Sequence, residues 1–268
     1  MFELMILPFI ACIVLTGIHA YLGIHVIERE VIFVDLALAQ IAALGSIIAF
    51  MLGIEFHTTS SYLFSLLFTF IGATIFALTR LKERKVPQEA IIGIVYAVMA
   101  AFAVLLIDKL PSEAGHIKYM LVGNILFVKW SEIIKMFLLY SAVGLFHYFY
   151  RKKFLLISLD VNEAKKQNVS IQWWDFLFYA SFGIVVTSSV EIAGVLLVFS
   201  YLIVPAVCAM LLADNLKSRL FLGWGFGLIG SLIGLYFSAA MDFPTGPAII
   251  CTFGLLFLIT ILLKKQKY

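Results

Sequence analysis

The sequence REVIFVDLALAQIAALG, from Arg29 to Gly45, decides how the rest of the chain is interpreted. It indicates an apolar helix with two polar side chains inside it, Asp35 and Gln40. Ionisable groups are costly inside a bilayer, and within membrane helices they usually mark a solute path or a buried pair. We therefore expect Asp35 and Gln40 to lie beside the path of a solute, provided that the whole chain is a membrane protein.

The composition is that of a polytopic membrane protein. Of the 268 residues, 63% are hydrophobic and only 13% are charged, and the mean hydropathy is +1.07. Soluble domains are usually near half apolar and a quarter charged. A membrane span takes about 20 residues, and such spans occupy nearly the whole length. We predict an all-α polytopic membrane protein that forms one transmembrane domain over residues 1–268.

Apolar runs recur about nine times, although the sixth is short and eight spans are also possible. The first run has no Lys or Arg before it and no clear cleavage site after it, so it is expected to be a retained span instead of a signal peptide. The runs cover residues 4–27, 31–54, 60–79, 89–107, 131–150, 173–188, 191–213, 219–240 and 245–263.

The basic residues predict the orientation of these spans. With nine spans, the loops on one side hold 15 of the 19 Lys and Arg residues, and the other side keeps four. Cytoplasmic loops carry the excess of Lys and Arg, so the N-terminus is expected outside and the C-terminus inside a cytoplasmic membrane. The net charge of +3 belongs to these loops, and membrane lipid, not nucleic acid, is the expected partner.

Several catalytic motifs are absent from the sequence. It contains no G-x-x-x-x-G-K-[ST], no H-E-x-x-H and no G-x-S-x-G, which excludes a P-loop nucleotide site and these metalloprotease and hydrolase signatures. The three cysteines lie in separate apolar segments and are expected to be core residues. We predict that the chain is not an enzyme and holds no permanently bound cofactor.

The ionisable residues within the apolar runs are the candidate site residues. Besides Asp35 they are His19, His25 and Glu191. Carboxylates suit manganese, and imidazole suits zinc and iron. Each also has a structural alternative: the histidines as hydrogen-bonded core residues, Asp35 as a paired carboxylate, and Glu191 as the cap of a helix start at the outer surface.

Asp35 and Gln40 are five positions apart, which places them about 140° apart around a straight helix. Either they face different neighbours, or the helix is broken between them, as helices in transporters often are.

Three further stretches have recognisable patterns. LDVNEAKKQNVSIQWWD, residues 159–175, predicts a short amphipathic surface helix. MDFPTGP, residues 241–247, predicts a tight external turn, with Asp242 placed to cap the start of the last span. FLGWGFGLIGSLIG predicts close helix packing, because one helix face carries four glycines, Gly223, Gly227, Gly230 and Gly234.

Five segments, in order along nearly the whole chain, resemble the permease subunits of bacterial ABC importers for zinc, manganese or iron. The second span of that family commonly has the form FLGDALSHAVLPG, and the others resemble GN-x-L-x-V-x-W, FDPE-x-A-x-x-x-G, VVGILLV-x-A-L-L-I-x-P-A-A-x-A and GLYLSYYLDLPTGA. Here they are GIHVIEREVIFVDLALAQIAALG (23–45), GNILFVKW (123–130), SLDVNEAKKQNV (158–169), IAGVLLVFSYLIVPAVCAMLLA (192–213) and GLYFSAAMDFPTGPAI (234–249).

The resemblance implies a homodimeric permease that receives a divalent metal from an extracytoplasmic metal-binding protein. A separate ATP-binding cassette subunit would hydrolyse the ATP and dock on the loop that contains Asp160, Glu163 and Ala164. Asp35 and Gln40 would line the transport path, with Glu191 and Asp242 on its outer part or at the docking surface for the binding protein. The metal is then a transported substrate, with Asp35 as its candidate ligand.

The second span departs from the family pattern. When Phe33 and Gly45 are aligned with the family's flanking residues, Leu36 takes the place of its Asp and Gln40 that of its His, so Asp35 is displaced by one position, about 100° of helix. Leucine cannot coordinate a metal. Three alternatives stay open: a permease of the same fold for another solute such as a metal chelate, an ATP-independent secondary transporter or channel, and a membrane scaffold without transport.

Overall fold

The structure is a computed structural model that describes residues 2–56, 58–80, 86–108, 123 and 125–265. Within these ranges every regular element is helical, and nine helices are long and apolar enough to cross a membrane. The all-α fold class and the nine-span alternative are therefore confirmed. The basic residues predicted in the loops at 82–85 and 109–118, and at 267, lie outside the described residues.

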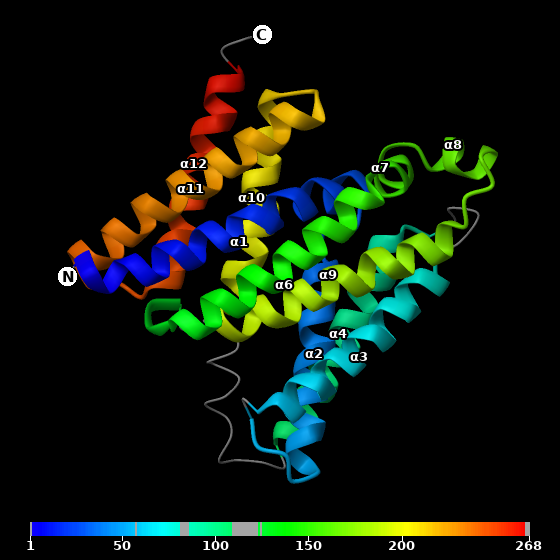
Figure 1. Cartoon of the computed structure of the whole chain (residues 1–268), viewed down its shortest axis with the longest axis horizontal. Helices are drawn as coiled ribbons and strands as arrows, with labels where there is room; N and C mark the ends of the chain where they lie inside the picture. Colours follow the sequence, from blue (N-terminus) through cyan, green and yellow to red (C-terminus); the bar gives the residue numbers. More distant parts are fainter. Residues whose placement is uncertain (1, 57, 81–85, 109–122, 124, 266–268) are drawn as a thin grey trace. The chain divides into compact units, whose positions relative to one another are not determined.

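The helices form two compact units, and each unit is assembled from segments far apart in the sequence (Figure 1). Unit 1 comprises Met1–Ile27, Lys118–Gly144 and Ser189–Tyr268. Unit 2 comprises Glu28–Ile117 and Leu145–Ser188. The single transmembrane domain over residues 1–268 stays a prediction.

The core of unit 2 is built around α2 (Val34–Met51), which packs against α3 (Thr59–Leu78) and α4 (Gln88–Ile107). Most of the α2 side chains are buried, and many are alanine, which lets neighbouring helices approach closely. Helix α3 begins where the Thr58 side chain accepts a hydrogen bond from the Ser61 N–H. Helix α4 follows Pro87, which cannot donate a backbone hydrogen bond.

Two short helices of unit 2, α7 (Arg151–Leu159) and α8 (Val161–Lys166), lie in sequence between α6 (Trp130–Phe149) and α9 (Ile171–Ala193) (Figure 1). The predicted amphipathic surface helix corresponds to α8, where Ala164 is buried and its neighbours are largely exposed. Helix α7 was not predicted, because its Arg151, Lys152 and Lys153 follow the apolar run and carry no apolar periodicity of their own.

Unit 1 contains α10 (Val195–Leu212), α11 (Leu216–Met241) and α12 (Thr245–Lys265), which pack against one another (Figure 1). It also contains most of α1 (Phe2–Glu28) and the short 3-10 helix η2 (Ile125–Phe127). The four glycines of α11 are all buried. A Cβ at Gly227 would lie 2.4 Å from Thr16 Cγ2, and one at Gly234 would lie 2.6 Å from Ile249 Cα. The predicted close packing along this stripe is confirmed.

One predicted boundary and two predicted helix caps are wrong. The break between the sixth and seventh spans lies at Gly194, not near residue 190, because α9 continues to Ala193 and Gly194 adopts a positive φ of 78° that glycine tolerates. Glu191 therefore lies in the last turn of α9 and caps no helix start. Asp242 is the left-handed C-terminal cap of α11, so it ends that helix, and α12 starts at Thr245.

Candidate functional site

Asp35 lies in the first turn of α2 and is fully buried. Neither of its carboxylate oxygens has a hydrogen-bond partner among the residues that the structure describes. The N-terminal end of a helix favours a carboxylate electrostatically, but burying an unpaired charge is costly. A carboxylate in this position has the capacity to bind a cation.

Gln40 lies on a different face of the same helix. Helix α2 is continuous from Val34 to Met51, so of the two alternatives from sequence the helix is unbroken and the two side chains have different neighbours. Gln40 is half-buried, and so is Leu36, one turn before it. The helix face with Leu36 and Gln40, the positions aligned with the family's two polar residues, is thus the more exposed one. Asp35 lies on another face, in the interior of unit 2.

A second carboxylate, Glu89, lies at the same end of α2 and was missed by sequence reasoning. Its Oε1 accepts a hydrogen bond from the Phe33 N–H at 2.9 Å, and its Oε2 has no partner in the described part of the chain. Its position at the first residue of a predicted span was the available signal, because an acidic residue there is favourably placed at a helix N-terminus.

His19 belongs to a buried polar chain in unit 1. Its Nδ1 lies 2.8 Å from the Leu15 carbonyl oxygen, which can only accept a hydrogen bond, so Nδ1 carries the proton. Its Nε2 then accepts from Ser189 Oγ at 3.3 Å, and Ser189 Oγ accepts from the Tyr140 hydroxyl at 2.5 Å. This is the structural alternative given above for His19.

His25 is buried as well and packs edge-on against Tyr21, with ring centroids 4.7 Å apart. Across the residues that the structure describes, His, Cys, Asp and Glu side chains form no group of three or more that could hold a metal ion. In these ranges, one chain therefore brings together fewer than three such ligands at any one place. Asp35 is the fully buried carboxylate of α2, the helix predicted to line the transport path.

The segment from Asp160 to Ala164 is well ordered by local contacts. Asp160 caps α8, because its Oδ1 accepts a hydrogen bond from the Glu163 N–H at 2.9 Å. Glu163 in turn accepts from the Gln167 side chain at 3.0 Å. Ala164 is fully buried against Ile157 and a group of partly buried residues, Leu156, Ile171 and Trp174. Asp160 and Glu163 shape an exposed helix, whereas Ala164 anchors it to unit 2.

Glu191 and Asp242 are exposed residues of unit 1, whereas Asp35 and Gln40 belong to unit 2. Around Asp242, the Ser238 side chain donates to the Phe243 carbonyl oxygen at 2.8 Å and lies 3.0 Å from Thr245 Oγ1. These contacts hold the predicted turn together. A role of Glu191 and Asp242 in transport stays a prediction.

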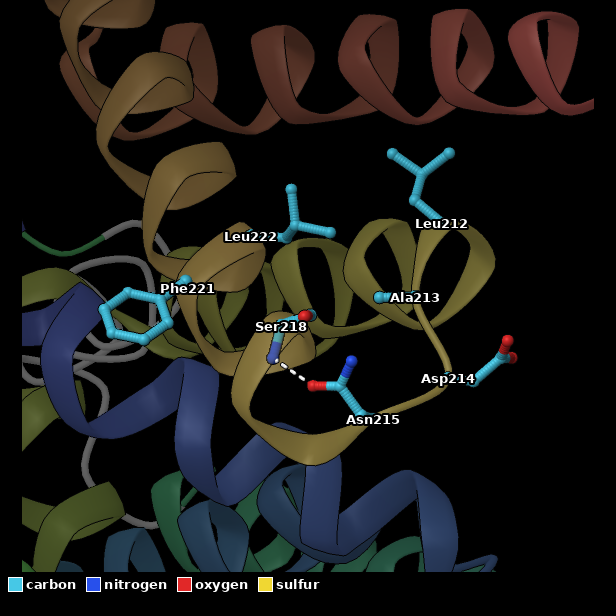
Figure 2. Close-up of a pocket in the computed structure, with 7 residues that line it drawn as sticks. All are labelled: Leu212, Ala213, Asp214, Asn215, Ser218, Phe221 and Leu222. Carbon is cyan, nitrogen blue, oxygen red and sulfur yellow. Dashed lines mark hydrogen bonds between the residues drawn. The ribbon is translucent and has the colours of Figure 1, made fainter.

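A surface pocket of about 620 Å³ lies at the junction of α10 and α11 in unit 1 (Figure 2). Asn215 caps α11 there by accepting a hydrogen bond from the Ser218 N–H at 2.8 Å. The pocket has one carboxylate, Asp214, and its other lining residues are Leu212, Ala213, Phe221 and Leu222. None of the predicted site residues lines it, and we assign it no function.

Comparison with known proteins identifies the family. The model of the ABC 3 transport family matches residues 1–264. A manganese transport system membrane protein, MntC, from Listeria innocua is 26% identical, covering 93% of this chain and 87% of that protein. A probable iron transport system membrane protein from Haemophilus influenzae is 25% identical, covering 99% and 96%.

Solved structures agree with this assignment. PsaBC from Streptococcus pneumoniae, solved in complex with Fab, matches with a TM-score of 0.77 and 25% identity, covering 96% of this chain and 91% of the matched chain. A putative metal-chelate type ABC transporter in an inward-facing conformation matches with a TM-score of 0.71 at 22% identity and supports the fold alone.

The family resemblance inferred from the sequence is therefore confirmed, and the absence of a P-loop agrees with it because ATP hydrolysis in such transporters belongs to a separate subunit. The chain belongs to the ABC 3 transport family and is the multi-pass membrane permease subunit of an ABC transporter, not an enzyme.

Proposed function

We propose that this permease imports a divalent transition metal, with manganese as the first candidate and iron and zinc as the others. The observation that carries the proposal is the family match over residues 1–264, joined by relatives named as manganese transport membrane proteins in Listeria and Synechocystis. The carboxylate of Asp35 suits manganese, which prefers oxygen ligands.

The same family membership supports the proposed partners. The permease works as a homodimer with an ATP-binding cassette subunit, and it receives the metal from an extracytoplasmic metal-binding protein. The N-terminus lies outside and the C-terminus, with α8, in the cytoplasm, an orientation that the excess of basic residues on one side supports. Asp35 and Gln40 line the path, Glu191 and Asp242 lie on its outer part or at the docking surface for the binding protein, and metal is substrate, not cofactor.

The transported ion is identified by the metal content of cells. Cells that lack this chain are expected to contain less manganese than wild-type cells when grown under manganese limitation, because their ATP-driven import is lost. Total manganese, iron and zinc are measured by mass spectrometry, with the wild-type gene returned as the control. A selective fall in iron or zinc would reassign the metal. Unchanged contents of all three would contradict metal import and favour a chelate or another solute.

Docking of the ATP-binding subunit at α8 is tested with alanine substitutions at Asp160 and Glu163. The Asp160 cap is worth about 1 kcal/mol to a helix, and α8 has only six residues. Both variants are therefore expected to weaken co-purification of the ATP-binding subunit with a tagged permease, and Asp160→Ala more strongly. Glu132→Ala is a matched control, since Glu132 caps the start of α6 through the Lys129 N–H at 2.8 Å in a loop expected to be external. Unchanged association in both variants would contradict docking at α8.

A further inference from the structure

Three charged side chains of unit 2 that take no part in the proposed path form a buried ionic cluster: Arg29, Arg80 and Asp175. Asp175 is fully buried near the start of α9, and its Oδ1 lies 2.6 Å from Nη1 of Arg29. Its Oδ2 accepts a hydrogen bond from the Arg80 guanidinium. Breaking a buried ion pair leaves an uncompensated charge at high cost, so the three side chains hold one another in place.

Arg29 also contacts residues outside this cluster. Besides Asp175, its Nε donates to Ser158 Oγ at 2.8 Å, and its Cζ lies 4.0 Å from the centroid of the Phe178 ring. Burial lowers the pKa of the Arg29 guanidinium, and the Asp175 carboxylate acts in the opposite direction. Guanidinium is planar and its donors are fixed in direction, which makes these contacts specific in geometry.

On one side the cluster is continuous with α8. Ser158 lies in the last turn of α7, two residues before the Asp160 cap. Trp174, the neighbour of Asp175, packs on the cluster of buried residues that contains Ile157 and Ala164. Packed side chains therefore connect α8 with the segments that carry Ser158 and Asp175.

On the other side, the cluster is connected along the chain to the start of α2, the helix proposed to line the transport path. Arg29 begins the short connector to α2, and Phe33 at the end of that connector is bonded to Glu89 of α4. Arg80 follows the end of α3, and α3 and α4 both pack on α2. The connector, the end of α3 and the start of α4 thus lie at the end of α2 that carries Asp35.

We propose that Arg29, Arg80 and Asp175 are positioning residues that transmit movement of α8 to the start of α2, so that ATP hydrolysis in the partner subunit is coupled to movement of Asp35 and Gln40. The inference rests on the proposed function, in which α8 docks that subunit. Charge-assisted bonds fix both distance and direction, whereas apolar contacts resist sliding less.

The test uses the permease with its ATP-binding subunit in liposomes and measures manganese transported per ATP hydrolysed. The triple variant Arg29→Met, Arg80→Met and Asp175→Leu is expected to fold, because apolar residues often replace a whole buried ionic group without loss of stability. It is expected to bind the ATP-binding subunit and hydrolyse ATP, but to transport about tenfold less manganese per ATP, a change typical of coupling between sites. Asp214→Asn, a change of an exposed carboxylate in unit 1, is the control.

A second pair of variants changes no charge. Ser158→Ala removes the hydrogen bond between α7 and Arg29, and Ser158→Thr keeps the hydroxyl. The ratio of manganese to ATP is expected to fall in the alanine variant and to stay near the wild-type value in the threonine variant, a difference that loss of folding would not produce.

Each outcome decides a question. A wild-type complex that hydrolyses ATP without moving manganese, iron or zinc contradicts the proposed function and removes the basis of this inference. A wild-type complex that transports manganese, with unchanged ratios in both the triple variant and Ser158→Ala, overturns the coupling role alone. If the triple variant does not assemble, the comparison of alanine with threonine at position 158 decides.

Discussion

Asp35→Asn is expected to lower ATP-driven manganese uptake at least about tenfold, because it removes the charge of the carboxylate that we propose binds the ion, and lost support of a metal site costs about 10–100-fold. The substitution keeps the size of the side chain, so packing in the fully buried site changes little. An amide is neutral and binds a divalent cation far more weakly than a carboxylate does.

Uptake of radioactive manganese into proteoliposomes that contain the assembled transporter measures this effect. Asp35→Glu keeps the charge and is expected to retain more uptake than Asp35→Asn. Asp214→Asn makes the same chemical change at an exposed site and is expected to transport at the wild-type rate. Wild-type uptake by Asp35→Asn, with the complex assembled, would remove Asp35 from the path and leave Gln40 as its predicted polar residue.

Gly23→Ala is expected to destabilise unit 1 strongly. A Cβ at position 23 of α1 would lie 1.9 Å from the carbonyl oxygen of Leu202 in α10. That atom belongs to the backbone and cannot rotate away, so the two helices must separate. Overpacking typically costs 1–3 kcal/mol, and because no side chain can yield here we expect about 3 kcal/mol or more.

Thermal unfolding of the purified permease checks the prediction, with an expected fall in midpoint of about 6–12 °C for a chain of this size. Gly17→Ala is a matched control on the same helix, because a Cβ there would meet nothing within 4 Å and alanine favours helix over glycine. Equal midpoints for the two variants would show that α1 and α10 do not approach as closely as described.

The membrane fold could be predicted because its signals are local. Each span is a long apolar run, and the glycine stripe of α11 repeats at helical spacing within one segment. The end of α9 had no comparable signal: Gly194 lies within a continuous apolar stretch, and its positive φ depends on how the backbone turns between two consecutive helices. Helix α7, rich in basic residues, could not be recognised from hydropathy.

The candidate site was predictable only in part. Asp35 was found because a carboxylate in an apolar run is conspicuous. Its orientation away from Gln40 follows from the continuity of α2, and the sequence alone is compatible with both a broken and an unbroken helix. Arg29 and Arg80 were counted among the basic residues that set the orientation of the spans. Their partner Asp175 is 146 and 95 residues away, and hydropathy carries no information about such pairings.

The separation of Arg29 from Asp175 also sets an order for biogenesis. The two are 146 residues apart, so at about 5–20 residues per second a ribosome needs roughly 7–30 s to synthesise the carboxylate after the arginine. During that interval the connector before α2 has its guanidinium but not its partner, and the first spans are inserted before their final contacts exist. We therefore expect the Arg29–Asp175 pair to form only after the start of α9 has been synthesised, and a chain that ends before residue 175 lacks the carboxylate of this pair.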